Sequence, residues 1–279
     1  MRFENSKSAQ LAVLLTAVIW STGGLAVKLS DCSPTALTGI RSIFCMLLFL
    51  IVYRREKLLT FSRAQWAGAA AYCSMAYCYS ASTMWTTAAN AILLQYTAPV
   101  FVAIFSWWLL REKVSSRDWL AIGCVMAGIF LFFMDKASPG HMLGNAVAVL
   151  SGLSYALFIV FSRMQKDANP AGSIFLGNLI ALAVSLPELV TTNLTTSAIA
   201  GGMYLGLVYG GLAFILYAGA IKRVNALTAI LIATIEPILN PIWVFLTIGE
   251  TPSLMAVVGG VIVVGTLLVR NIAEVKMQQ

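Results

Sequence analysis

The chain has 279 residues, of which 59% are hydrophobic and 10% are charged, and its formal net charge is +7. Soluble domains carry roughly 25% charged residues, so this composition excludes a water-soluble globular fold and indicates a polytopic protein of the lipid bilayer. A net positive charge suits nucleic acid in a soluble protein, but in a membrane protein it reflects which side the loops face, and we expect no nucleic-acid partner.

Apolar segments of about 20 residues recur along the chain and predict ten membrane-spanning helices. In chain order the predicted spans are 9–29, 34–53, 65–83, 88–110, 117–134, 142–162, 171–191, 200–220, 225–248 and 252–270. The first has neither the short apolar core nor the cleavage site of a signal peptide, so we expect it to be retained. Short connections predict that neighbouring helices run antiparallel.

The basic residues predict the orientation of these spans. Most of the 18 lysines and arginines lie in the N-terminal segment, after the even-numbered spans or in the C-terminal tail. Basic loops face the cytoplasm, so both termini are predicted to be cytoplasmic. Lys28 falls on the other side, where it is expected to be solvated. The pattern suits a multi-pass protein of a bacterial inner (plasma) membrane.

Two distant segments of the chain match each other. Residues 91–112, AILLQYTAPVFVAIFSWWLLRE, align with residues 229–250, AILIATIEPILNPIWVFLTIGE, at a constant offset, so that Pro99 and Glu112 match Pro237 and Glu250. We therefore divide the chain into five-helix repeats at 1–136 and 137–279. Because five is odd, the second repeat starts from the opposite side. Such inverted repeats place the substrate site of transporters near the midplane, between the halves.

Glu236 is the acidic residue that the predicted spans place near the middle of the bilayer. A carboxylate at that depth costs roughly 2.5–3.5 kcal/mol on insertion scales, so a chain that keeps one usually uses it. Burial also makes a carboxyl group harder to ionise, which makes Glu236 a candidate proton carrier. The alternative is a carboxyl group that serves packing alone. Asn240 and Trp243 share its helical face, and the equivalent face of the fourth span carries Gln95.

Arg41 is the cation that lies within a predicted span, roughly 10 Å from the outer end of its helix. Intramembrane arginines usually face the bundle interior and pair with another group. The candidate partners are Glu236 and a carboxylate of the substrate. The alternative is that the side chain reaches the outer surface.

Three prolines within the fourth and ninth spans, Pro99, Pro237 and Pro241, are candidate hinges or helix breaks. Each removes a backbone donor and frees a carbonyl group, which is tolerated at membrane depth where the backbone is buried in protein or lines a watery cavity. Aromatic residues inside the spans are candidates to line a cavity for an aromatic or cationic solute, with core packing as the alternative: Trp20, Tyr96, Tyr155 and Trp243.

The chain contains no phosphate-binding loop, no HExxH and no GxSxG, and its five cysteines and one histidine lack metal-ligand spacing. We therefore expect no enzyme, no cofactor and no metal site. Gly202, Gly206 and Gly210 form a GxxxGxxxG row that predicts close helix packing. The working unit is expected to be a monomer or a homodimer.

These features together resemble the drug/metabolite transporter superfamily, in its ten-helix EamA-type branch, over essentially the whole chain. The resemblance is carried by AVIWSTGGLAVK at 17–28, Pro34 with Arg41, Leu110 to Lys113, Ser154-Tyr155-Ala156, Ile235-Glu236-Pro237 and Ile248-Gly249-Glu250. Tyr155 departs from the tryptophan that is frequent there in the family. The resemblance implies two EamA-like repeats around a central cavity, alternating access, and structural roles for Glu112 and Glu250.

The resemblance further implies secondary transport of a small-molecule substrate, typically export of amino acids or related metabolites, often with proton exchange. The leading hypothesis is proton-coupled export of amino acids or related small metabolites. The second is uptake or exchange of a cationic, quaternary-ammonium-like solute, with Glu236 as counter-ion and the aromatic residues around it. The third is a membrane scaffold that transports nothing.

Overall fold

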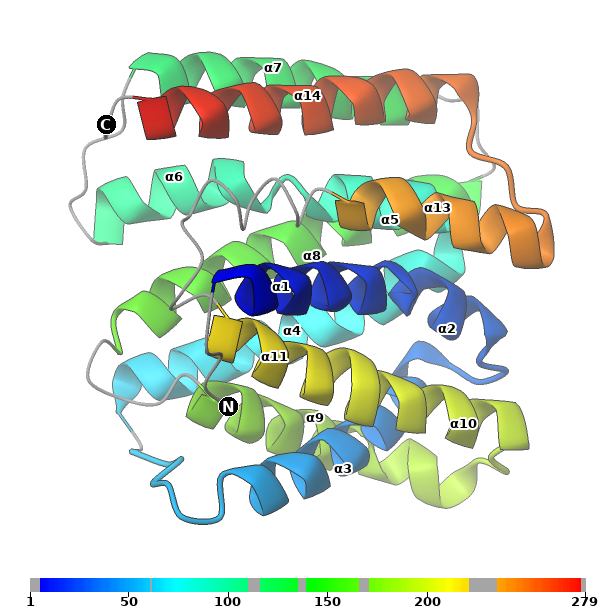
Figure 1. Cartoon of the computed structure of the whole chain (residues 1–279). Helices are drawn as coiled ribbons and strands as arrows, with labels where there is room; N and C mark the ends of the chain where they lie inside the picture. The colour runs from blue at the N-terminus through cyan, green and yellow to red at the C-terminus, as the bar shows by residue number, and fades with distance from the viewer. Residues whose placement is uncertain are drawn as a thin grey trace.

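The computed structural model of the chain describes residues 6–60, 62–109, 116–134, 139–165, 171–220 and 235–276. These residues form helices and no strands, and the helices run roughly parallel or antiparallel to one common direction (Figure 1). The expected all-α polytopic architecture is confirmed.

The first half contains α1 (Ser6–Ser21), α2 (Gly23–Leu29), α3 (Pro34–Val52), α4 (Arg63–Trp85), α5 (Ala88–Gln95), α6 (Ala98–Leu109) and α7 (Ser116–Met134). The second half contains α8 (Pro139–Arg163), α9 (Ala171–Thr191), α10 (Thr196–Tyr204), the π-helical segment η1 (Leu205–Leu212), α11 (Ala213–Ala220), α13 (Ile235–Ile248) and α14 (Leu254–Lys276). The pairs α1–α2 and α5–α6 and the run α10–η1–α11 each correspond to one predicted span.

The hydropathy of these helices fits a membrane. Six helical segments of the described chain are long and apolar enough to cross a bilayer, and three shorter apolar stretches lie in α7, α13 and α14. The remaining span, α4, is rich in alanine, serine and tyrosine, and many of its residues are buried. It packs along α8 and α9, so it needs less lipid-compatible surface. The first part of the ninth predicted span, 225–234, lies outside the described residues.

Equivalent helices of the two halves pack against each other. The fifth spans α7 and α14 lie side by side at one edge (Figure 1), and the second spans α3 and α9 pack along each other. The contact of α4 with α8 is matched by contacts of α1 with η1 and α11. This is the pattern that a two-fold relation between two five-helix repeats produces.

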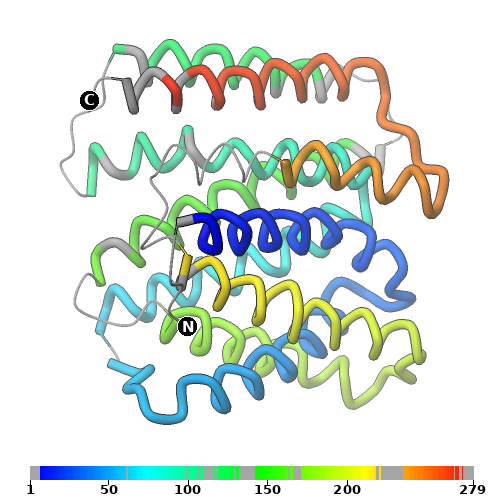
Figure 2. The backbone as a smooth tube through the Cα atoms, viewed as in Figure 1, coloured from blue at the N-terminus to red at the C-terminus, as the bar shows by residue number. Residues whose placement is uncertain are grey.

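The two halves also start from opposite ends of the bundle. The chain trace in Figure 2 runs from the start of α1 at one end to the start of α8 at the other. The start of α1 and the end of α14 lie at the same end. The predicted inverted repeat is therefore confirmed.

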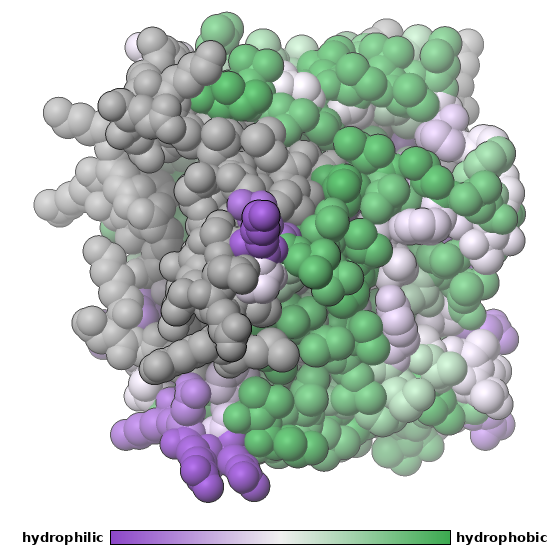
Figure 3. Space-filling model, viewed as in Figure 1, coloured by the Kyte–Doolittle hydropathy of each residue, from purple (hydrophilic) through white to green (hydrophobic). Residues whose placement is uncertain are grey.

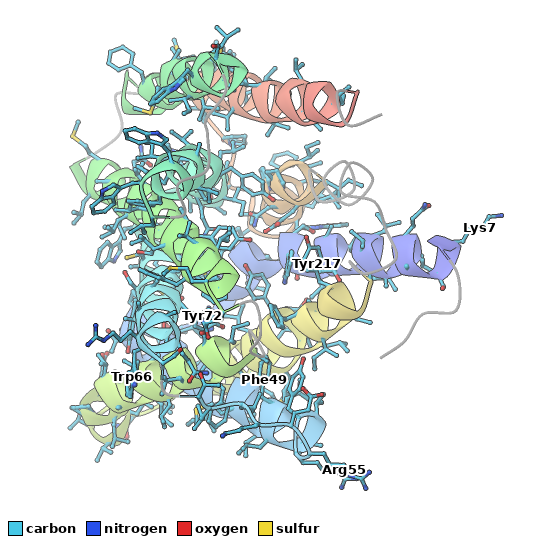
Figure 4. All side chains as sticks on the ribbon, turned by 90° about the vertical axis from the view of Figure 1, so that its left-hand side faces the viewer. Lys7, Phe49, Arg55, Trp66, Tyr72 and Tyr217 are labelled. Carbon is cyan, nitrogen blue, oxygen red and sulfur yellow. The ribbon has the colours of Figure 1, made fainter. Side chains whose placement is uncertain are left out.

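Apolar residues cover most of the surface coloured in Figure 3, with hydrophilic residues gathered towards its ends. Large exposed apolar side chains such as Ile51, Leu120 and Val190 belong to this surface, which a soluble protein would not tolerate. Lys7 and Arg55 extend away from the bundle at the end that faces the viewer in Figure 4, while Tyr72 and Tyr217 lie among the helices.

Glycines at 202 and 206 set the distance between the eighth span and α3. A Cβ atom on Gly202 would collide with the side chain of Ile40, and one on Gly206 would collide with the backbone oxygen of Arg41. A backbone atom in a packed helix cannot move aside cheaply. The glycine row therefore packs within the bundle and brings η1 against the helix that carries Arg41.

Replacing Gly206 with alanine is expected to destabilise the protein by about 1–3 kcal/mol, because the added methyl group overpacks the η1–α3 contact. Thermal unfolding of the purified protein in detergent measures the effect. Gly123→Ala is the matched control, since a Cβ atom there has no neighbour within 4 Å. Equal unfolding temperatures for the two variants would contradict this account of the packing.

Candidate functional site

The site is organised around Glu236 in the first turn of α13, whose side chain is buried in the interior of the bundle. The hydroxyl group of Tyr96 donates a hydrogen bond of 2.9 Å to Oε2 of Glu236. Tyr96 lies directly after α5, where the fourth span is interrupted. The interrupted span of the first half thus meets the start of α13 in the second half.

The interruption in the fourth span lies just before Pro99. The helix α5 ends at Gln95, and α6 begins at Ala98 after a turn at Tyr96 and Thr97. Pro99 has no N–H group to donate to the carbonyl of Gln95, which is the helical partner of that position. In α13, Pro237 lies in the first turn, where proline is tolerated, and Pro241 lies inside the helix. Their roles as hinges stay predictions.

Tyrosines from three further spans surround Glu236. Tyr79 of α4, Tyr155 of α8 and Tyr209 of η1 lie close enough to the carboxyl group to interact with it electrostatically. The rings of Tyr79 and Tyr209 are stacked, with centroids 6.2 Å apart and an interplanar angle of 11°. Tyr79 and Tyr209 were not among the candidate site residues. Aromatic residues occur in most spans, so only their convergence on Glu236 distinguishes these two.

Arg41 is also buried, with 4% of its surface exposed, so its side chain does not reach the outer surface. Its Nη2 atom donates a hydrogen bond of 3.4 Å to the hydroxyl of Tyr72, and its Nε atom has no hydrogen-bond partner within the described chain. The described residues contain no ion pair between Arg41 and Glu236. Instead, Tyr79 and Tyr209 lie within electrostatic reach of both charges.

The other predicted residues occupy several positions around this centre. Trp20 donates to the backbone oxygen of Tyr209 at 3.1 Å, and its ring lies 5.4 Å from that of Tyr217. Trp243 donates to the hydroxyl of Ser21 at 2.9 Å.

Of the two predicted amides, only Asn240 belongs to the centre of the site. Gln95 points elsewhere and donates to the hydroxyl of Ser151 at 2.8 Å. Asn240 is fully buried beside α2, and neither of its amide atoms has a hydrogen-bond partner in the described part of the chain.

Two consecutive glycines allow this convergence. A Cβ atom on Gly24 would lie 2.5 Å from Oδ1 of Asn240, and one on Gly23 would overlap the ring of Tyr209. They open α2, directly after the interruption of the first span at Thr22. The Gly-Gly pair therefore lets α13 and η1 approach the first span closely.

A polar link joins helix ends at the end of the bundle opposite the termini. Nζ of Lys28 lies 2.7 Å from Oε2 of Glu250 and donates to the backbone oxygen of Thr86 at 2.8 Å. Oε1 of Glu250 accepts a hydrogen bond of 2.6 Å from the backbone N–H of Ala88. The link joins both halves of the chain, and it corrects the expectation that Lys28 is solvated. Glu112, which matches Glu250 in the first repeat, lies outside the described residues.

The groups at this site are suited to binding a polar solute. Within the described residues no group of three histidine, cysteine, aspartate or glutamate side chains could hold a metal ion. The centre offers one carboxyl group, one guanidinium group, several phenol groups and one amide. A small polar solute with complementary charges fits such a set.

Comparison with known proteins identifies the fold. The model of the EamA-like transporter family matches residues 7–134 and again residues 142–271. The chain belongs to this family. Relatives of this EamA protein include the uncharacterized transporter YwfM of Bacillus subtilis, 24% identical with 96% of this chain and 95% of YwfM covered. An uncharacterized transporter of Archaeoglobus fulgidus is 29% identical, with 68% and 70% covered.

More distant comparisons agree on the architecture. Human solute carrier family 35 member G1 is 25% identical, with 62% of this chain and 53% of the human protein covered. A crystal structure superposes with a TM-score of 0.68 at 18% identity, covering 96% of this chain and 99% of that one, and it shows a shared fold. The family resemblance expected from the sequence is confirmed. The EamA protein is a membrane transporter by family, and its relatives are named as transporters.

The Lys28–Glu250 pair is expected to show coupling in a double-mutant cycle. Lys28→Met and Glu250→Gln should each lower the free energy of unfolding of the EamA protein. The loss in the double variant should be smaller than the sum of the two single losses. Because both side chains are partly exposed, we expect a coupling of about 1 kcal/mol or less. Thermal or denaturant unfolding in detergent measures it. Strictly additive effects would show that the pair contributes nothing to this end of the bundle.

Proposed function

We propose that this EamA protein exports amino acids or related small metabolites across a bacterial inner membrane in exchange for protons. The observation that carries the proposal is the pair of buried opposite charges, Glu236 and Arg41, which are not paired with each other. A buried charge without a counter-charge is costly, so this arrangement favours a ligand that supplies both counter-charges.

An amino acid has the required charges. Its ammonium group matches the carboxylate of Glu236, and its carboxylate matches the guanidinium of Arg41, whose Nε donor has no partner within the described chain. Arginine suits this role because its rigid set of N–H donors matches the geometry of a carboxylate. The stacked rings of Tyr79 and Tyr209 lie within reach of both charges and offer an apolar surface to the remainder of the solute.

Glu236 is also the group we propose for proton coupling. Without a solute cation, a carboxyl group in this interior is favoured in its neutral, protonated form, because burial disfavours charge. An arriving ammonium group stabilises the charged form and displaces the proton. The hydroxyl of Tyr96 holds the carboxyl group in place in either state, since it can donate to a neutral or a charged oxygen. Solute and proton then compete for one residue, as exchange requires.

The charge pattern and the Lys28–Glu250 link support the proposed orientation and the proposed loading side. The basic loops support cytoplasmic termini, and the termini lie opposite the Lys28–Glu250 link. In this orientation the Lys28–Glu250 link lies at the outer end, so we propose that a solute loads from the cytoplasm before the link opens. Because one chain supplies both halves and all the named groups, we propose the single chain as the working unit.

Transport of a cationic solute is the second candidate. The phenol rings of Tyr79, Tyr96, Tyr155 and Tyr209 around one carboxylate suit an ammonium group, which aromatic faces attract. Arg41 disfavours this reading, because its charge repels a lone cation in the same interior. Choline-like compounds therefore belong in the panel of test solutes.

The decisive experiment uses the purified protein in liposomes that enclose a pH-sensitive dye. Amino acids and small amines are added one at a time to wild type, to Glu236→Gln and to Glu56→Gln, in which an exposed loop carboxylate is changed. Amino acids are expected to drive proton movement in wild type and in Glu56→Gln. In Glu236→Gln the rate of this proton movement should fall by about tenfold or more. Solute movement without protons in wild type would remove the coupling from the proposal.

Arg41→Ala distinguishes the two candidate substrates. We expect it to raise the half-maximal concentration of amino acids by about tenfold or more, because the solute carboxylate loses its charged partner. The exposed residue Arg54, changed to alanine, is the matched control. The half-maximal concentration of choline-like solutes should not rise in Arg41→Ala. Wild-type transport of amino acids by Arg41→Ala would contradict the assignment of Arg41.

A further inference from the structure

Three buried polar atoms without hydrogen-bond partners gather at the centre of the site. They are the hydroxyl oxygen of Tyr79 and both amide atoms of Asn240, on residues that are 3% and 0% exposed. The Tyr79 hydroxyl lies beside the Asn240 side chain and the Tyr209 hydroxyl, but its geometry completes a hydrogen bond with neither. Buried polar groups in proteins are nearly always bonded, so a cluster of this kind requires an explanation.

The cluster lies near the buried charges. Asn240 follows Glu236 by four residues and therefore shares its face of α13. Tyr79 lies within electrostatic reach of both Glu236 and Arg41. A solute that places one end at each charge brings its middle to these atoms.

Polar side chains of the same bundle differ in this respect: the buried hydroxyl of Thr83 also has no hydrogen-bond partner in the described residues, whereas two other side chains are bonded. Asn178 in α9 donates to the backbone oxygen of Ile174 at 2.9 Å, and Tyr77 in α4 donates to that of Ala181 at 2.9 Å. The fold can therefore satisfy a buried amide or phenol where only packing is required. Asn240 is moreover accommodated by a glycine at position 24, which leaves room for its amide. The unbonded atoms of Tyr79 and Asn240 are therefore available to a ligand.

We propose that Tyr79 and Asn240 form a neutral hydrogen-bonding subsite that selects solutes with a hydroxyl or primary amide group close to their charged groups. The subsite deepens the proposed function, because Glu236 and Arg41 hold the charged ends of the same solute. The amide of Asn240 donates and accepts at once, and the phenol of Tyr79 can do either. A hydroxyl or amide satisfies these atoms, whereas a hydrogen atom or methyl group leaves them unpaired, and sites of this kind reject such analogues strongly.

The test measures transport of solute pairs that differ by one hydroxyl group, in liposomes containing the full chain. The pairs are serine with alanine, threonine with 2-aminobutyrate, and choline with ethyltrimethylammonium. Wild type is expected to prefer the hydroxylated member of the pair it carries by about tenfold or more. Tyr79→Phe, which keeps the ring stacked on Tyr209, and Asn240→Leu should both bring the ratio towards one.

Tyr77→Phe is the matched control, because it removes a bonded hydroxyl from the same helix. It should lower the unfolding temperature and leave the transport ratio unchanged. Tyr79→Phe should not lower the unfolding temperature, since its hydroxyl gives up no hydrogen bond. This difference separates a binding role from a structural one and shows whether the variant is folded.

Failure of the subsite and failure of the proposed function give different results. If only the choline pair is carried, the amino-acid assignment is wrong, and the ratio for that pair still decides the subsite. If no hydroxylated solute is preferred by wild type, or if the preference survives in both Tyr79→Phe and Asn240→Leu, the subsite is overturned. In that case bound water alone satisfies these atoms.

Discussion

Burying a carboxyl group and a guanidinium group inside a bilayer is the constraint on which the rest of this structure depends. Each group costs several kcal/mol in an apolar medium unless other groups compensate it. The chain surrounds Glu236 and Arg41 with phenol groups from several spans, and it brings those spans together with glycines at 23, 24, 202 and 206. Close helix packing and the polar centre are thus parts of one arrangement.

The helices of the two halves are arranged symmetrically, but their charged side chains are not. Helices α3 with α9 and α7 with α14 pack as two-fold partners, and α6 and α13 begin at equivalent places in their repeats. The carboxylate, however, occurs only in the second half, and the intramembrane arginine only in the first. A symmetric scaffold favours two related conformations that open to opposite sides, while unequal side chains allow one solute to be held in a defined orientation between the halves.

The link between Lys28 and Glu250 differs from the buried charges at the centre of the site in its exposure to water. Lys28 and Glu250 are partly exposed and bonded to backbone groups of Thr86 and Ala88, so water can replace these contacts at modest cost. The central charges are shielded from water and have few partners. Contacts that water can replace at the surface suit a transporter that changes conformation repeatedly. Buried charges with few partners at the centre suit discrimination among solutes.

The sequence by itself determined the all-helical membrane architecture, the inverted repeat and the burial of Glu236. These properties depend on hydropathy, on internal similarity and on one carboxylate in the middle of a span, and all three are local or periodic signals. It also singled out Tyr96, as an aromatic residue inside its span, and Asn240, because Asn240 shares the helical face of Glu236.

Only the tertiary structure decided which residues meet. It placed Tyr79 and Tyr209 within electrostatic reach of both charges, turned Gln95 towards Ser151, kept Arg41 apart from Glu236 and joined Lys28 to Glu250. These contacts link spans that are far apart in the chain. They depend on helix rotation and on close approach at glycines, which the composition of a single span does not encode.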